Sequence, residues 1–269
     1  MFRGFYTAAS GMLAQQRTLE NLTNNLANTQ TPGYKADRHS LRAFPEMLLS
    51  HMQKGKTSQR RTVGTLNTGV YMHELTPNFE QGVIQSTGLL TDLALVNGIM
   101  PVSDDGIRGT ILFTVENPDS GYFYTRNGNF TLDADGFLTT SSGHYVLDWN
   151  GARIQLESPE FQVHEDGWIV QDGEPVARLG IVLAENPNEL VKRGNGFYTT
   201  DVDLPTAYDA EGVTFTVRQA ALEQSNVDQA QTMTEMLTAF RSFEANQKVL
   251  QAYDRSMEKA VNEIGKIGP

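Results

Sequence analysis

The stretch from Val227 to Ile267 decides the fold, and it reads VDQAQTMTEMLTAFRSFEANQKVLQAYDRSMEKAVNEIGKI. It carries an apolar residue at every seventh position: Met236, Phe243, Leu250, Met257 and Ile264. On a slightly underwound helix such a row stays on one face. Burying each of these side chains yields about 1.5–3 kcal/mol, whereas fixing the backbone costs about 1–2 kcal/mol per residue. The stretch is therefore predicted to be a long helix that needs a partner.

The start of the chain supplies a second apolar row with the same spacing: Phe5, Met12, Leu19 and Leu26. This helix is predicted to run from about Gly4 to Asn28, because Thr31-Pro32-Gly33 must turn the chain. Two interpretations stay open. The rows pack against each other in a helical assembly, or the two helices form an intramolecular hairpin that closes one ordinary domain.

Length and composition limit what the chain can be. With 269 residues, 20% of them charged and 39% hydrophobic, it has the composition of a soluble globular protein with one or two domains. No apolar run approaches the roughly 18–20 residues that cross a bilayer, so no transmembrane segment is expected. The first residues do not resemble a cleavable signal peptide. Cysteine is absent, which excludes disulfides and thiolate metal sites.

Charge is unevenly distributed along the chain, whose net charge is −11. Residues 1–62 hold nine Lys/Arg and three Asp/Glu, whereas the rest of the chain holds 12 Lys/Arg and 29 Asp/Glu. A solvated basic linker explains this better than charge-complementary packing between chains, which stays open. Nucleic acid is not expected as a partner, because the one basic cluster, Lys54, Lys56, Arg60 and Arg61, has no interleaved aromatic residues.

The middle of the chain changes to short alternating runs separated by turn pairs such as Asn127-Gly128 and Asp135-Gly136. The predicted fold class is α+β, with long N- and C-terminal helices that pair as a coiled-coil-like helical domain and flank an all-β central domain. The predicted divisions are an N-terminal helix at 1–34, an extended basic connector at 35–75, the β domain at 76–220 and a C-terminal helix at 221–269. Within the connector, a short helix is considered at Phe44 to Met52.

No catalytic, cofactor-binding or metal site is predicted, and the chain is not expected to be an enzyme. The five histidines are scattered, without the spacing of a zinc site or a nucleophile elbow. Asp133-Ala134-Asp135-Gly136 is interpreted as a hairpin turn, because the further acidic residues of a calcium loop are missing.

Several motifs resemble the bacterial flagellar rod and hook proteins, most closely the distal rod protein and its near relatives. The first is Ala8-Ala9-Ser10-Gly11-Met12 followed by Ala27-Asn28-Thr29-Gln30-Thr31-Pro32-Gly33-Tyr34-Lys35. Thr91-Asp92-Leu93-Ala94-Leu95, Tyr124 to Phe130, Leu222 to Asp228 and Arg241 to Gln247 follow in the order seen in that family. The positions that carry the resemblance include Asn28, Thr31, Pro32, Gly33, Tyr34, Arg126, Gly128, Ser225, Asn226 and Arg241.

The resemblance implies a structural subunit of the flagellar basal-body rod, outside the cytoplasmic membrane. Such subunits polymerise through their terminal helices into a hollow axial drive shaft, after type III flagellar export without a cleaved signal peptide. The implied partners are copies of the chain itself, other rod and hook subunits and the export apparatus. The nine residues of the two apolar rows would form the assembly interface.

A second function class remains open from sequence. In this alternative the chain is a secreted β-domain module that binds cell-wall glycan, and its helices serve only its own fold. Trp149 and Trp168 are candidate platforms for stacking on sugar, although lone tryptophans more often belong to a core.

Overall fold

The computed structural model describes residues 3–52, 60–103, 106–118 and 121–264. Lys54 and Lys56 of the predicted basic cluster, and Ile267, lie outside these residues. The chain divides into two compact units. Unit 1 comprises residues 1–27, 37–76 and 228–269, and unit 2 comprises residues 28–36 and 77–227.

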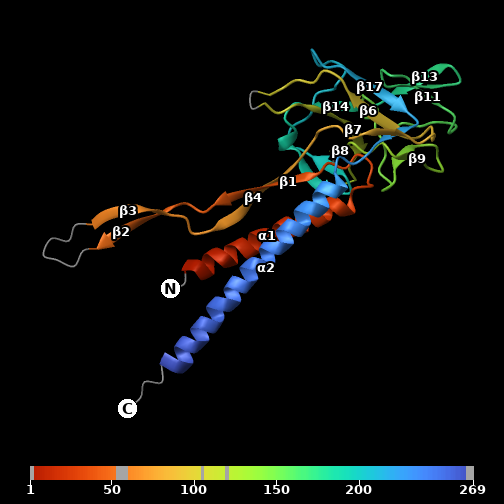
Figure 1. Cartoon of the computed structure of the whole chain (residues 1–269). Coiled ribbons are helices and arrows are strands. Elements are labelled where there is room, and N and C mark those ends of the chain that lie inside the picture. The colour runs from red at the N-terminus through yellow and green to blue at the C-terminus, as the bar shows by residue number, and fades with distance from the viewer. Residues whose placement is uncertain (1–2, 53–59, 104–105, 119–120, 265–269) are drawn as a thin grey trace. The chain divides into compact units, whose positions relative to one another are not determined.

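Unit 1 contains two helices, α1 (Arg3–Ala27) and α2 (Gln229–Lys259), and α2 continues as a short π-helical segment, Ala260–Ile264. The helices lie side by side and contact each other (Figure 1). The carboxylate of Asp228 caps α2 by accepting a hydrogen bond of 3.0 Å from the backbone N–H of Gln231. Both terminal helices were predicted from the sequence and are confirmed.

The strands of unit 1 are β1 (Asp37–Ala43), β2 (Met47–Met52), β3 (Arg60–Leu66) and β4 (Val70–Pro77). β1 pairs with β4, and β2 pairs with β3 in antiparallel register, with Met47 opposite Leu66. The short helix considered at Phe44 to Met52 was wrong. Pro45 disfavours a helical conformation at Phe44, and β3 supplies a backbone partner that sequence periodicity does not reveal.

Unit 2 is predominantly β, as predicted. Its largest sheet has the order β14-β7-β8-β16-β15 and joins β7 (Thr110–Glu116), β8 (Tyr122–Thr125), β14 (Ile181–Ala184), β15 (Val191–Gly194) and β16 (Phe197–Thr199). A three-stranded sheet joins β11 (Gln162–Val163), β12 (Trp168–Gln171) and β13 (Glu174–Arg178). The remaining pairs are β9 (Phe130–Leu132) with β10 (Leu138–Thr140), β6 (Leu93–Asn97) with β17 (Phe215–Gln219), and β5 (Ile84–Ser86) with β18 (Ala221–Glu223). A short 3₁₀ helix, η1 (Pro187–Glu189), precedes β15.

The core of unit 2 forms around β7, in which every residue from Thr110 to Val115 is buried. Leu93, Phe113, Phe130 and Ile181 belong to one continuous apolar cluster. Gly128 allows this packing, because a Cβ atom there would lie 1.6 Å from the carbonyl oxygen of Leu93. Asn127-Gly128 therefore serves close backbone approach, and it is not a hairpin turn, because the flanking strands β8 and β9 pair with other strands.

Removal of the α2 cap tests the origin of this helix. We expect Asp228→Ala to reduce the free energy of unfolding of unit 1 by about 1 kcal/mol, because an N–H group of the first turn loses its partner. Thermal unfolding followed by far-ultraviolet circular dichroism measures the change. Asp228→Ser is the control and should retain most of the stability; equal losses in both variants would exclude capping as the cause.

Candidate functional site

Residues 28–36, which carry the first family motif, fold as part of unit 2. The side-chain oxygen of Asn28 accepts a hydrogen bond of 3.1 Å from the Thr31 hydroxyl, and the Tyr34 N–H donates to the carbonyl of Thr31. Gly33 has a φ of +68°, and a Cβ atom there would lie 2.5 Å from the Arg126 backbone. The turn predicted at Thr31-Pro32-Gly33 is confirmed, and its glycine is required by conformation and by space.

Beside this turn lies a buried charge cluster of Lys35, Arg126 and Glu223. The Lys35 ammonium donates to Glu223 Oε1 at 2.7 Å, and the Arg126 Nε donates to Glu223 Oε2. All three side chains are at most 1% exposed. One carboxylate therefore joins two cations that lie 91 residues apart in sequence.

The remaining polar atoms of the charge cluster are well satisfied. Arg126 donates to the carbonyls of Ile111 (2.6 Å) and Leu95 (2.8 Å) and to the Asn97 side chain, and Lys35 donates to the Glu80 carbonyl at 2.8 Å. Charged groups are expensive to bury unless they are paired and hydrogen-bonded, and this cluster meets both conditions. The cluster ties residues 28–36 to strands of the β core.

The charge cluster shifts the pKa values of Glu223 and Lys35. Burial alone would raise the pKa of Glu223, but the charges of Arg126 and Lys35 outweigh it and hold that pKa below its ordinary value. Burial lowers the pKa of Lys35 to about 8, against the opposing effect of Glu223. At neutral pH the ions are therefore present in the folded unit.

Asn226 makes a second set of connections to the same segment. Its side chain accepts the Ala36 N–H at 2.8 Å and donates to the carbonyls of Asn78 (2.7 Å) and Glu80 (3.0 Å). The neighbouring Ser225 hydroxyl accepts the Val227 N–H at 3.3 Å. The Lys192 ammonium lies 4.3 Å from the centre of the Tyr34 ring. Most family-motif positions therefore meet in one region of unit 2, whereas Arg241 lies exposed on α2 of unit 1.

In unit 1, small residues of α1 lie directly against side chains of α2. A Cβ atom at Gly4 would lie 2.0 Å from the Tyr253 hydroxyl, and one at Gly11 would lie 3.0 Å from Asn246. A step of seven residues forward on α1 thus matches a step of seven backward on α2, which makes the helices antiparallel. The same row continues through buried polar and small residues: Thr18 and Asn25 on α1, and Ala239 and Thr232 on α2.

The predicted apolar rows lie next to this contact and are half-buried: Phe5, Met12, Leu19 and Leu26 on α1, and Met236, Phe243, Leu250 and Met257 on α2. The side chain of Ile264 lies outside the described residues. The antiparallel register places Phe5 near the level of Leu250, and Met12 near that of Phe243. Contacts between copies of the chain through these rows stay a prediction.

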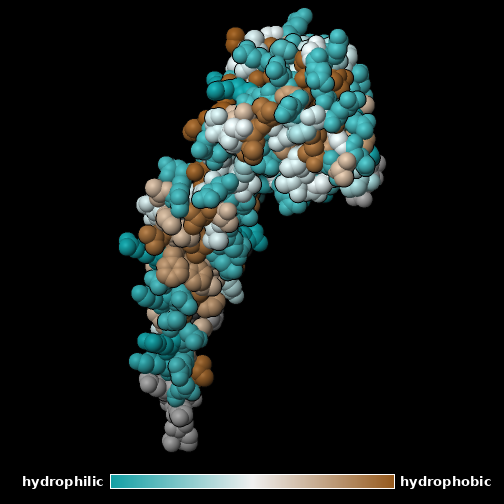
Figure 2. Space-filling model, turned by 90° about the vertical axis from the view of Figure 1, so that its right-hand side faces the viewer, coloured by the Kyte–Doolittle hydropathy of each residue, from teal (hydrophilic) through white to brown (hydrophobic). Residues whose placement is uncertain are grey.

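Large apolar side chains also remain exposed on both helices. On α1, Tyr6 is 67% and Leu13 is 57% exposed; on α2, Leu237 is 57% and Phe240 is 49% exposed. Figure 2 shows apolar surface, in brown, interrupting the polar surface of this unit. One chain alone leaves these side chains uncovered, which is characteristic of interaction surfaces.

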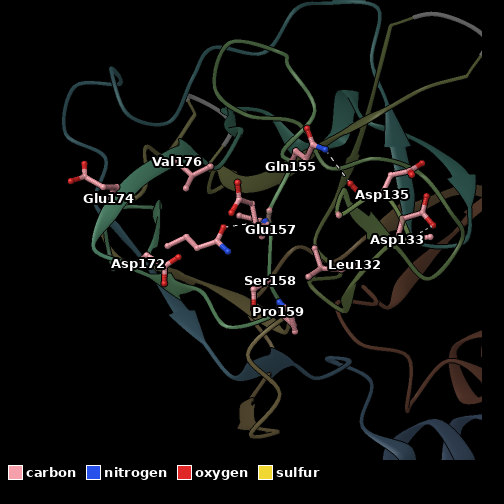
Figure 3. A pocket seen from close by; sticks show the side chains of 14 residues that line it. Leu132, Asp133, Asp135, Gln155, Glu157, Ser158, Pro159, Asp172, Glu174 and Val176 are labelled. Atoms are coloured by element: carbon pink, nitrogen blue, oxygen red, sulfur yellow. Dashed lines mark hydrogen bonds between the residues drawn. The ribbon is translucent and has the colours of Figure 1, made fainter.

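A cavity of about 770 Å³ in unit 2 is bordered by carboxylates. Figure 3 shows Asp133, Asp135, Glu157, Asp172 and Glu174 spread around it rather than converging on one point. Asp133 and Gly136 form the predicted hairpin turn, with the Gly136 N–H donating to the Asp133 carbonyl at 3.0 Å. Among the described residues, no three His, Cys, Asp or Glu side chains come together as metal ligands. Nor is any described helix long and apolar enough to cross a membrane.

Three family models match in chain order. The flagella basal body rod protein model matches residues 5–35, the flagellar hook protein FlgE/F/G D1 domain matches 106–171, and the flagellar basal body rod FlgEFG protein C-terminal model matches 218–263. The chain is 44% identical to the flagellar hook-basal body complex protein FlhO of Bacillus subtilis, over 99% of this chain and 100% of the relative. This chain belongs to the flagellar basal-body rod and hook protein family.

Other members of the flagellar rod and hook family are also similar over nearly their whole length. The flagellar basal-body rod protein FlgG of Bacillus subtilis is 32% identical, over 97% of this chain and 99% of the relative. FlgG of Borreliella burgdorferi is 31% identical, over 97% of this chain and 98% of the relative. The protein is thus a structural component of the flagellum and not an enzyme, and the alternative of a glycan-binding module is not supported.

Sequence reasoning missed the partnership of Lys35 with Glu223 and the small-residue contact between the helices. Both charged residues lie within quoted family motifs, yet 188 positions separate them, and nothing in either motif pairs them. The small row, by contrast, had a readable signal: Gly4, Gly11, Thr18 and Asn25 stand seven apart. A search restricted to apolar residues passes over it.

Neutralising the shared carboxylate tests the charge cluster. We expect Glu223→Gln to reduce the free energy of unfolding of unit 2 by about 3–5 kcal/mol, because two buried cations lose their counter-ion. Urea denaturation measures the loss. Glu116→Gln is the matched control, since Glu116 pairs with Arg153 at a half-exposed site, and should cost at most about 1 kcal/mol. A loss as small as that of the control would contradict the structural role of the cluster.

The lowered pKa of Glu223 also predicts how the stability difference between wild type and Glu223→Gln depends on pH. A carboxylate whose pKa is lower in the folded state stabilises above its unfolded value, ordinarily 4.5, and loses this effect as the pH falls through its folded value. We expect the stability gap between wild type and Glu223→Gln to be full at about pH 7 and to shrink below about pH 4.5. Urea denaturation across this range measures the gap, and one that stays constant would show that the carboxylate charge is not responsible.

Proposed function

We propose that this protein is a subunit of the flagellar basal-body rod, which polymerises through α1 and α2 into a hollow axial drive shaft. The observation that carries the proposal is the antiparallel helix pair, whose large apolar side chains remain half-buried or exposed in a single chain. Family membership supports the flagellar setting, and the exposed apolar side chains supply a physical reason for assembly.

Small residues at the helix contact explain how α1 and α2 can pack against each other within one chain and also against helices of neighbouring subunits. Gly4 and Gly11 let α1 and α2 approach closely within one chain. Residues beside the contact, including Met12 and Phe243, then retain apolar area for packing within and between subunits in a coiled-coil-like arrangement. Head-to-tail contacts of this type repeat without closing and build a filament.

The proposed partners are copies of the chain, other rod and hook subunits, and the flagellar export apparatus. On this proposal the subunit leaves the cell by type III flagellar export without a cleaved signal peptide and assembles outside the cytoplasmic membrane. The span predicted as an extended basic connector, residues 35–75, instead contributes most of β1 to β4 to unit 1, and the chain enters unit 2 directly after α1 through residues 28–36.

Charge introduced into an apolar row tests the assembly. We expect Leu250→Asp to abolish motility on soft agar and to be absent from purified basal bodies, because burying an unpaired carboxylate costs several kcal/mol. Gln251→Asp, one position away and exposed, introduces a carboxylate of the same kind and should remain motile. Normal motility of Leu250→Asp would contradict the proposal.

A variant at an exposed position separates assembly from folding. Leu237 is 57% exposed, so Leu237→Asp should leave the thermal unfolding of the isolated chain unchanged. The same substitution should reduce incorporation into basal bodies at least about tenfold, equivalent to about 1.4 kcal/mol in the contact between subunits. Unchanged incorporation would show that this face of α2 meets no neighbour.

A further inference from the structure

A cavity of about 340 Å³ in unit 2 combines aromatic and acidic side chains. It lies beside β7, β8 and β14 and is separate from the charge cluster. Its walls include Thr114, Tyr122, Tyr124, Asp148, Trp149 and Asp203. No Lys, Arg or His side chain lines it among the residues that the structure describes.

Two aromatic rings are held exposed at this cavity. Trp149 is 52% and Tyr122 is 45% exposed. Trp149 stands on a tightly bonded turn, in which the Asp148 carboxylate accepts the N–H groups of Asn150 (2.9 Å) and Ala152 (2.7 Å). The Trp149 N–H donates to the Arg178 carbonyl at 3.0 Å, so the backbone that presents the indole is fixed.

The polar side chains of the cavity include two carboxylates, which only accept hydrogen bonds, and hydroxyl and amide groups, which both donate and accept. Asp148 and Asp203 contribute carboxylates. Burial and, after it, the negative charge of Asp203 raise the pKa of Tyr124, which lines the same cavity. The Thr114 hydroxyl is buried and has no hydrogen-bond partner among the described residues. The cavity thus offers negative charge and unused hydrogen-bonding capacity, but no cation.

Elsewhere in unit 2, three half-buried aromatic rings lie close to the chain's own cations. The Arg178 guanidinium lies 3.5 Å from the centre of the Tyr208 ring and 5.6 Å from that of Trp168, and Arg153 lies 4.1 Å from that of Tyr145. Over Trp149 and Tyr122, no such cation is found in the described part of the chain.

Unit 2 has few cations to supply, since its residues include 22 Asp/Glu and eight Lys/Arg, a net charge of −14. Lys35 and Arg126 are already committed to the charge cluster, and Arg153 pairs with Glu116. None of the described Lys and Arg side chains lines the cavity, which leaves it open to a cation from another molecule.

We propose that this cavity binds the guanidinium group of an arginine from a partner protein. Such a group stacks on aromatic faces through its plane and donates several hydrogen bonds to carboxylates, which matches Trp149, Tyr122 and Asp203. A lysine ammonium lacks the planar face, and an uncharged sugar leaves the carboxylates without a counter-ion. The inference does not depend on how the terminal helices assemble.

The test uses the full chain carrying Trp168→Phe, so that Trp149 is the remaining tryptophan. The probe is N-acetyl-arginine-methylamide, and the readout is Trp149 fluorescence. We expect a saturable change that Asp203→Asn weakens about tenfold, the usual effect of losing a hydrogen bond to a charged group. Asp201→Asn removes the same charge from the same loop, outside the cavity lining, and should bind within about twofold of the parent. Tyr122→Leu should weaken binding as well.

Parallel titrations separate the possible sources of the ligand. N-acetyl-lysine-methylamide, spermidine and methyl glucoside should each bind at least about tenfold more weakly than the arginine compound. Saturation by spermidine or the glucoside without saturation by arginine would overturn the proposal in favour of a free polyamine or a saccharide. Equal weakening by Asp203→Asn and Asp201→Asn would also overturn it, because the attraction would then be the general negative charge of unit 2.

Discussion

The attraction of one buried carboxylate for two cations is the constraint on which unit 2 depends. Glu223, at the end of β18, binds Lys35 from the motif segment and Arg126 from the turn after β8. Unit 2 is built from two separate parts of the chain, residues 28–36 and 77–227. Apolar packing has little directionality. Hydrogen bonds among three charged groups, by contrast, have fixed donors and acceptors, so they are compatible with one arrangement of the chain segments. The charge cluster therefore fixes the position of the short first part against the β core.

Unit 1 depends on a different constraint, the small size of the α1 residues that face α2. Gly4 and Gly11 face Tyr253 and Asn246, so the two helices approach where larger residues would collide. The large apolar residues are consequently displaced to the flanks and to the outer surface, where Tyr6, Leu13 and Leu237 are exposed. The small residues between the helices therefore explain both the close packing within one chain and the apolar surface that remains available to other chains.

The sequence predicts the helices and the β region better than it predicts which residues contact each other. Heptad spacing and the turn at Gly33 locate both helices, and turn pairs such as Asp135-Gly136 locate the β region. The strand at Met47–Met52 escaped prediction because its stability comes from pairing with β3. The bond between Lys35 and Glu223 joins residues 188 apart, and no local pattern encodes such a distance. The half-buried apolar rows were found from their seven-residue period, whereas the small residues between them, which share this period, are missed by a search restricted to apolar residues.

Disulfide cross-linking of basal bodies tests most directly whether the apolar rows meet between subunits. The antiparallel register places Leu19 near the level of residue 238 on α2, so Leu250 of the same chain lies about 18 Å further along the helix. A disulfide requires Cα atoms within about 7 Å, which excludes this pair within one chain. In a chain without native cysteines, Leu19→Cys with Leu250→Cys should give a ladder of dimers and higher species. Met12→Cys with Phe243→Cys, at one level, should give a cross-linked monomer. If the first pair yields no species larger than a monomer while the second pair reacts, the rows do not meet between subunits.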